Sequence, residues 1–102
     1  QRAQLIYAIA QELRLLQEEG AELLVRENGK TTSQAQDEFS NAVRYLEYYA
    51  GMADKIEGQS IPLGEDYIDF TVYEPLGVSA QIVPWNFPNG IQYCFVRNPL
   101  LL

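Results

Sequence analysis

Apolar residues in the first part of the chain recur at three- and four-residue steps, which is the pattern of an amphipathic helix. The pattern predicts a first helix over Arg2–Glu19, with Gly20 as its stop or kink. A further short helical piece is predicted over Ala21–Glu27, with Gly29 as its C-terminal stop. The expected apolar stripe of the first helix is Leu5, Ile9, Leu13 and Leu16, widened by Ile6 and Leu15.

A longer helix is predicted to follow Thr31 and to run to about Glu57, where Gly58 ends it. Ser33, followed three residues later by Gln36, fits a capping box at its start. The expected apolar stripe is Phe39, Val43, Leu46, Ala50, Ala53 and Ile56.

Three tyrosines, Tyr45, Tyr48 and Tyr49, crowd the middle of this predicted helix. Packing in the core is the simplest interpretation, and packing under a loop or against a partner subunit is also consistent with amphipathic rings. The wall of a substrate tunnel is the alternative.

The pattern changes from helical to extended after Gly58. Turn-forming residues separate a short extended piece, Ser60–Leu63, from Tyr67–Glu74, where β-branched and aromatic residues predict a strand. Pro75 ends that strand. The apolar run Val78–Val83 predicts a further strand covered on both faces.

Composition narrows the class of protein. The 102 residues suffice for one small domain, and 47% hydrophobic with 21% charged residues is ordinary for a globular chain. The net charge of −7 argues against a nucleic-acid partner, and no apolar run approaches the roughly 20 residues of a membrane helix. One cysteine, Cys94, cannot form an internal disulfide, so a cytoplasmic location is expected. Without histidine, no metal site is predicted.

The most distinctive chemistry lies where the predicted strand Val78–Val83 ends. Pro84 and Pro88 each fix a backbone angle, and Asn86 is the one strongly polar side chain between them. A carboxamide on a stiffened turn at the C-terminal end of a strand is well placed to donate its N–H to a developing negative charge. The simpler alternative is a turn asparagine that satisfies backbone groups.

Two other candidate sites do not meet their chemical requirements. The run Gly29-Lys30-Thr31 lacks the second glycine that a phosphate loop needs, because residue 24 is leucine. Lys30 is instead interpreted as a positive charge that complements a helix C-terminus. Cys94 has no cation beside it in the sequence that would favour a thiolate, so it is interpreted as a structural or incidental thiol.

Two sequence blocks resemble the aldehyde dehydrogenase superfamily. They are Tyr73-Glu74-Pro75-Leu76-Gly77-Val78 and Gln81-Ile82-Val83-Pro84-Trp85-Asn86-Phe87-Pro88, at a spacing that is highly specific. Earlier segments are similar to the same family, so that the resemblance covers residues 2 to 88; these are Arg26–Lys30, Tyr48–Gly51 and Asp54–Gly58.

The resemblance implies an α/β fold, which is α+β for a fragment. N-terminal helices are followed by a β-hairpin and by the first strand of a Rossmann-like dinucleotide-binding domain. The expected parts are a helical segment over 1–58, a hairpin linked to oligomerisation over 59–76, and the start of the NAD(P)-binding domain over 77–102.

The resemblance also implies a reaction, the oxidation of an aldehyde to a carboxylic acid with NAD or NADP in a homo-oligomer. Asn86 matches the family asparagine that donates to the oxyanion. The residues expected to line the cofactor site are Ile82, Val83, Pro84 and Trp85. The nucleophilic cysteine and the general base of the family lie farther along its chains, so this chain is expected to be an N-terminal part that is inactive alone. The alternative is a non-catalytic helical module for interaction or assembly.

The sequence departs from the family after Pro88, where a helix of small and apolar residues is usual. Here Asn89-Gly90 predicts a turn rather than a helix start, and Tyr93–Val96 favours a strand.

Overall fold

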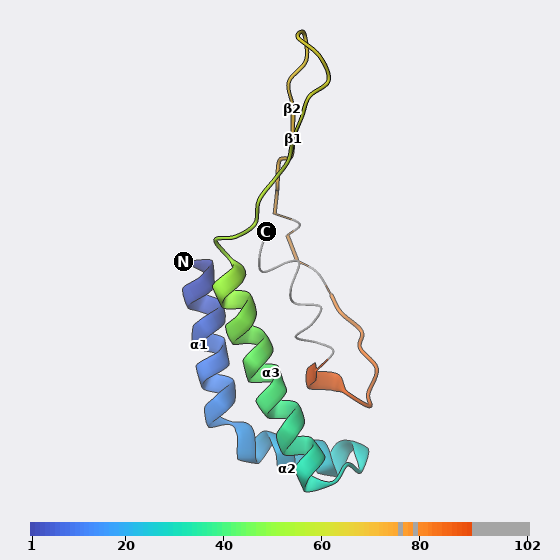
Figure 1. Ribbon diagram of the computed structural model, residues 1–102. Helices are drawn as coiled ribbons and strands as arrows, with labels where there is room; N and C mark the ends of the chain where they lie inside the picture. The colour runs from blue at the N-terminus through green and yellow to red at the C-terminus, as the bar shows by residue number, and fades with distance from the viewer. Residues whose placement is uncertain (76, 79, 91–102) are drawn as a thin grey trace.

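The computed structural model describes residues 1–75, 77–78 and 80–90, and these form a mostly helical chain with one small sheet (Figure 1). The elements, in chain order, are α1 (Arg2–Leu15), α2 (Gln17–Asn28), α3 (Thr32–Met52), β1 (Ser60–Ile61) and β2 (Asp69–Phe70). Helices α1 and α3 run side by side in opposite directions, and α2 crosses at the end where they are joined.

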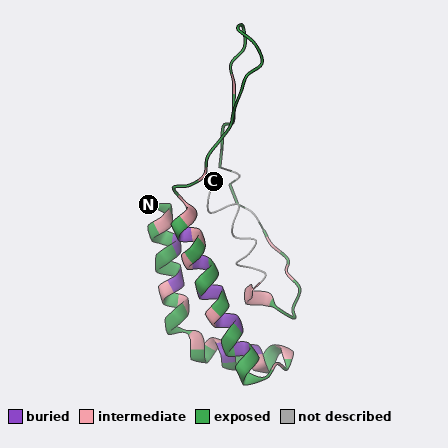
Figure 2. Ribbon diagram, in the orientation of Figure 1, coloured by how far each residue is buried: buried purple, intermediate pink, exposed green. Residues whose placement is uncertain are grey.

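The core lies between the helices in two neighbouring clusters. Half-buried Leu13 packs against both of them. Buried positions follow the inward faces of the helices, whereas the extended part of the chain has few covered positions (Figure 2). One cluster joins α1 to α3 and the other joins α2 to α3; their members are Ile6, Ala10, Val43, Leu46 and Ala50, and Ala21, Leu24, Ala35 and Phe39.

The buried face of α1 differs from the predicted stripe. Ile6 and Ala10 are fully buried against α3, whereas Leu5, Ile9 and Leu16 are exposed. The predicted stripe is confirmed at Ile6 and Leu13 and wrong at Leu5, Ile9, Leu15 and Leu16, because it followed the largest apolar residues. The contact with α3 uses a small residue, Ala10, which allows the two helices to approach closely.

The sequence predicted that Gly20 stops or kinks a helix, but in the structure Gly20 lies inside one. The chain turns at Leu16, and α2 begins at Gln17 and continues through Gly20. A Cβ added to Gly20 would overlap the ring of Phe39 in α3. The glycine is therefore required for the close packing of α2 on α3, rather than for a change of direction.

The turn between α2 and α3 was predicted correctly at its first residue. Gly29 adopts a left-handed conformation with φ 73°, and its N–H donates to the carbonyl of Val25. The capping box that starts α3 joins Thr31 to Gln34, so the predicted pair Ser33 and Gln36 is wrong.

Helix α3 ends at Met52, before the predicted end at Glu57. The N–H of Lys55 donates to the carbonyl of Met52 at 3.0 Å, which tightens the last turn. The ammonium group of Lys55 meanwhile donates to the carbonyl of Gly51 at 2.9 Å, the acceptor that one more α-helical turn would need. The lysine therefore satisfies the helix end from both its backbone and its side chain.

The β-hairpin projects beyond the helices (Figure 1). Strands β1 and β2 pair antiparallel, with Ser60 opposite Phe70 and Ile61 opposite Asp69. The predicted strand Tyr67–Glu74 is confirmed only at Asp69–Phe70.

The predicted strand Val78–Val83 is wrong for the positions that the structure describes, 78 and 80–83, which have no strand partner. An extended segment becomes a strand only when a neighbouring strand takes its backbone hydrogen bonds, and β1 and β2 pair with each other. Pro88–Gly90 is helical, so the predicted turn at Asn89-Gly90 is also wrong. Tyr93–Val96 and Cys94 lie outside the described residues.

Candidate functional site

The predicted site residues lie in sequence along one extended segment that ends in a turn. Ile82, Pro84 and Trp85 are exposed and Val83 is half-buried. Asn86 lies in the turn, and its exposed carboxamide has no hydrogen-bond partner among residues 1–75, 77–78 and 80–90. Within the part of the chain that the structure describes, the carboxamide of Asn86 is therefore not used to satisfy the turn.

The turn that carries Asn86 is held on one side by Asn28, the last residue of α2. The side-chain N–H of Asn28 donates to the carbonyl of Trp85, the residue before Asn86, at 3.4 Å. The side-chain oxygen of Asn28 accepts from the N–H of Lys30 at 3.2 Å. One asparagine thus joins Trp85 to the turn between α2 and α3. A small hollow of about 260 Å³ lies at this contact, lined by Glu27, Asn28, Trp85 and Pro88.

The far side of the turn is held by a lysine that the sequence had assigned to another role. The ammonium group of Lys30 lies 4.0 Å from the ring centre of Phe87, the residue after Asn86. The same group is ion-paired with Glu38 in α3. Lys30 therefore links α3 to the turn, rather than simply complementing the C-terminus of α2.

Glu38 is a buried residue beside the candidate site that the sequence analysis missed. Its side chain is buried in α3, yet one carboxylate oxygen accepts from Lys30 and the other accepts from the backbone N–H groups of Asn89, at 2.9 Å, and Gly90, at 3.3 Å. These bonds explain why the chain is helical at Pro88–Gly90, because a carboxylate satisfies the free N–H groups of a helix start. A carboxylate at an otherwise apolar position of α3, between Ala35 and Ala42, was the available signal.

The tyrosines of α3 are not core residues. Tyr45 and Tyr48 are exposed, so the predicted core packing is wrong for both. The rings of Tyr48 and Tyr49 meet edge to face, 5.2 Å apart at an angle of 78°. Together with Asn41 and Arg44, the three tyrosines line a hollow of about 330 Å³ on the outside of α3.

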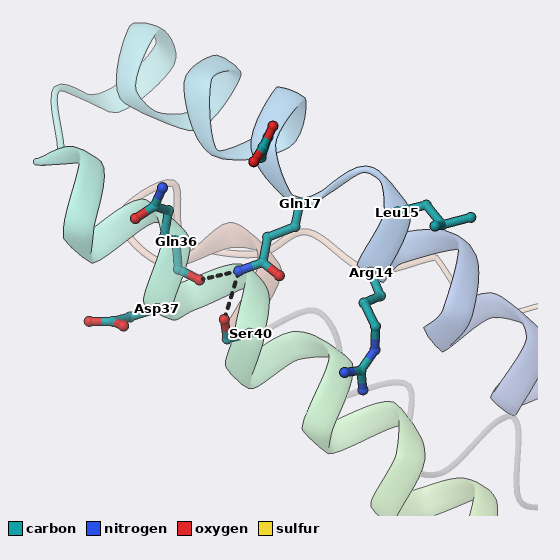
Figure 3. A pocket seen from close by; sticks show the side chains of 7 residues that line it. Arg14, Leu15, Gln17, Gln36, Asp37 and Ser40 are labelled. Atoms are coloured by element: carbon teal, nitrogen blue, oxygen red, sulfur yellow. Dashed lines mark hydrogen bonds between the residues drawn. The ribbon is translucent and has the colours of Figure 1, made fainter.

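A larger polar hollow of about 650 Å³ lies beside the turn between α1 and α2 (Figure 3). Gln17 reaches from this turn to α3, where its amide donates to the hydroxyl of Ser40 at 2.8 Å and to the carbonyl of Gln36 at 3.5 Å. These bonds fix the direction of the chain at Leu16. The polar groups of Gln17, Gln36 and Ser40 in this hollow therefore have a structural explanation.

Neither a metal centre nor a membrane helix is found within residues 1–75, 77–78 and 80–90. No three acidic, cysteine or histidine side chains of this part lie together in a way that could hold a metal ion. None of its helices is both long enough and apolar enough to cross a bilayer.

Comparison with known proteins gives consistent results. The family model described as "Aldehyde dehydrogenase family" matches residues 1–100. The chain is 47% identical over 62 residues to an aldehyde dehydrogenase of Emericella nidulans, which covers 61% of this chain and 12% of the relative. It is 53% identical over 51 residues to retinal dehydrogenase 2 of Mus musculus, which covers 50% of this chain and 10% of the relative.

Solved structures extend the similarity over almost the whole chain. The NAD+ complex of the aldehyde dehydrogenase from Bacillus cereus is 42% identical and superimposes with a TM-score of 0.86. The match covers 98% of this chain but 21% of that one. The chain thus spans about a fifth of the length of the solved structure that it matches.

Proposed function

Because this chain belongs to the aldehyde dehydrogenase family, we propose that it is the N-terminal part of an enzyme that oxidises an aldehyde to a carboxylic acid with NAD or NADP. The observation that carries the proposal is the free carboxamide of Asn86, with Trp85 and Phe87 on its two sides both held against the turn between α2 and α3. The contacts of Trp85 and Phe87 support the role that the family resemblance gives to Asn86.

The proposed role of Asn86 follows from the charge that the reaction creates. When a nucleophile attacks an aldehyde, the carbonyl oxygen becomes negatively charged. An N–H that already points at this position stabilises the charge without reorganising. The carboxamide of Asn86 has no hydrogen-bond partner among the described residues, so its N–H is available to donate. The flanking prolines restrict the backbone that carries it. The nucleophile itself is assigned to a cysteine outside this sequence.

The cofactor is assigned to the segment just before Asn86. NAD or NADP, when bound, accepts the hydride that leaves the substrate. Ile82, Val83, Pro84 and Trp85 fit such a ligand because their extended chain is largely exposed and offers both main-chain polar groups and apolar surface. The similar Bacillus cereus enzyme was solved with NAD+, which supports this assignment.

The role of Asn86 can be tested in the full-length enzyme with Asn86→Ala. We expect the single-turnover rate of NADH formation to fall about 10²–10³-fold, roughly 2.7–4 kcal/mol, because one oxyanion donor is lost. NAD affinity should stay nearly constant. The control is Gln4→Ala, which removes an exposed carboxamide from α1, away from the candidate site and the hairpin. An unchanged rate in Asn86→Ala would remove the oxyanion role.

The chain of 102 residues gives a second test. It holds no residue assigned as nucleophile or general base, so we expect the purified chain to form no NADH from any aldehyde. NADH absorbance above that of a protein-free blank would contradict this division of the enzyme.

The hairpin and the helices support a second candidate function, that of a non-catalytic assembly module. Apolar side chains on the projecting hairpin, among them Ile61, Ile68 and Phe70, are exposed and could meet a second copy of the chain. We assign this homo-oligomeric contact to residues 59–76. Sequencing the transcript beyond Leu102 separates the two functions, since a downstream Gly-Gln-x-Cys block supports the enzyme and an early stop codon supports the module. The single cysteine of this sequence supports a cytoplasmic location for either.

A further inference from the structure

The strongest unexplained feature of the molecule is a buried charge. Glu38 is 4% exposed, although α3 places it in line with Ala35, Phe39 and Ala42, which are all apolar and buried. A carboxylate in such a place must be paired and hydrogen-bonded to be tolerated. Lys30 supplies one partner, and that pair alone would satisfy the charge.

The second carboxylate oxygen of Glu38 contacts a distant part of the chain. It accepts the N–H groups of Asn89 and Gly90, which lie 51 and 52 residues farther along the chain. Two adjacent backbone donors on one charged acceptor fix both the position and the direction of the segment. A leucine or methionine at position 38 could fill the same space but would leave both N–H groups without this acceptor.

The contacts on the other side of the turn complete a bracket around Asn86. The carbonyl of Trp85 is held by Asn28, the ring of Phe87 by Lys30, and the backbone of residues 89–90 by Glu38. All three holding residues belong to a single stretch, Asn28–Glu38, around the turn between α2 and α3. None of these contacts involves the side chain of Asn86.

We infer that Glu38 is a positioning residue, which holds the amide of Asn86 at the angle that the reaction needs by fixing the backbone of residues 89–90. The inference rests on the proposed function of Asn86. Lys30 has two parts in it, since it neutralises Glu38 and packs on Phe87. Such an arrangement is effective because an oxyanion donor loses most of its value when it is displaced by about 1 Å.

The test uses the full-length enzyme with Glu38→Gln. The substitution keeps the shape but removes the charge, and it turns an N–H donor toward either Lys30 or the amides of residues 89–90. We expect the single-turnover rate of NADH formation to fall about 10-fold to 100-fold, with little change in NAD affinity. The matched control is Glu47→Gln, because Glu47 lies on the same helix and pairs with Arg14, away from the turn. Its rate should be unchanged.

Comparison in the Asn86→Ala background distinguishes positioning from general damage. If Glu38 acts through Asn86, Glu38→Gln should slow the enzyme further by less than twofold once the amide is absent, whereas a merely structural defect would slow both backgrounds equally. A rate for Glu38→Gln within twofold of the wild type, alongside a slow Asn86→Ala, overturns the inference and leaves the proposed function standing. An unchanged Asn86→Ala overturns both.

A second variant covers the case in which Glu38→Gln does not fold. Replacing both members of the buried pair, in Lys30→Met/Glu38→Met, removes the charges together and is often tolerated in a core. This variant should fold but show the same loss of rate, because residues 89–90 have lost their acceptor. A folded double variant with a wild-type rate overturns the inference.

Discussion

The helical part, residues 2–52, and the mostly extended part, residues 60–75, 77–78 and 80–90, contain similar kinds of side chain but differ in how far they bury them. In the helices, Leu46 is 1% exposed and lies in a continuous core. In the extended part, Ile68 is 91% exposed and Trp85 is 72% exposed. The helices therefore bury an apolar core between them, while the extended part holds its shape through two short strands and a few polar bonds. We expect its apolar side chains to need surfaces beyond the described residues.

The two parts meet at the turn between α2 and α3, where the contacts are mainly polar. Asn28, Lys30 and Glu38 hold the turn that carries Asn86 without burying much apolar surface. The site is thus attached to a stable helical base by a few directional bonds. The comparison leads to four predictions, in order of decreasing effect.

The largest difference is expected between Leu46→Ala and Ile68→Ala. Removing a fully buried leucine should lower the free energy of unfolding of the helices by about 2–5 kcal/mol, because a cavity is left. Removing the exposed isoleucine should change it by less than about 0.5 kcal/mol. Urea denaturation followed by far-ultraviolet circular dichroism measures both values. Equal effects would show that the hairpin is part of the same core.

The next prediction concerns two helical glycines, Gly20 and Gly51. Gly20→Ala should lower the free energy of unfolding by about 1–3 kcal/mol, because its new methyl group overlaps the ring of Phe39. Gly51→Ala is the control, with open space around the added carbon, and should raise it by about 0.5–1 kcal/mol. The same denaturation assay gives both. A stabilising Gly20→Ala would show that the ring of Phe39 does not pack against Gly20 in solution.

A smaller effect is expected at the start of α3. Thr31→Ala should cost about 1 kcal/mol of unfolding free energy, because the hydroxyl accepts from the N–H of Gln34 at 3.3 Å. Ser33→Ala, inside the helix, should cost almost nothing or slightly stabilise it. Thermal unfolding of the two variants under one set of conditions compares them. The reverse order would restore Ser33 as the cap.

The smallest effect is expected at the junction between the two parts, at Asp54 and Lys55. The hydrogen bond from Lys55 and the charge of its ammonium group hold the pKa of the Asp54 carboxyl below its ordinary value. Because the pKa of Asp54 is lower in the folded chain than in the unfolded chain, the pair stabilises the folded chain at pH values above the ordinary pKa. This stabilisation is lost as the pH falls through the lowered pKa of the folded chain. Lys55→Met should return the carboxyl titration, followed by NMR, toward its ordinary range. An unchanged midpoint would mean that the pair does not persist in solution.

The sequence predicted a helix end correctly where a single residue determines it. Gly29 was identified because a left-handed residue at a helix end has few substitutes. Periodicity failed at Gly20 and Leu16, since the position of a break depends on whether a partner helix needs close approach, and Phe39 is remote in sequence. The start of α3 after Thr31 was predicted correctly, but the capping pair was assigned to Ser33 and Gln36 instead of Thr31 and Gln34, because the cap is set by where the chain leaves the Gly29 turn.

The sequence indicated the candidate residue Asn86 but not the residues that hold the turn around it. Asn86 stands out in a short motif, so the residue type and its rigid neighbours could be identified without coordinates. The holding residues could not, because their bonds join positions more than 50 residues apart and follow no local pattern. A buried glutamate in an apolar helix face was the one clue. The distant partners of that glutamate, the N–H groups of residues 89 and 90, follow only from the three-dimensional structure.

The spacing of the Glu38 contacts also matters while the chain is being made. Lys30 lies 8 residues before Glu38, whereas Asn89 lies 51 residues after it. At the usual speed of a ribosome, roughly 3–10 s pass before the nascent chain delivers those last two amides. Lys30 is synthesised before Glu38 and is therefore available to neutralise its carboxylate throughout that interval. The carboxylate of Glu38 thus has a partner close in sequence, Lys30, long before the N–H groups of Asn89 and Gly90 are synthesised.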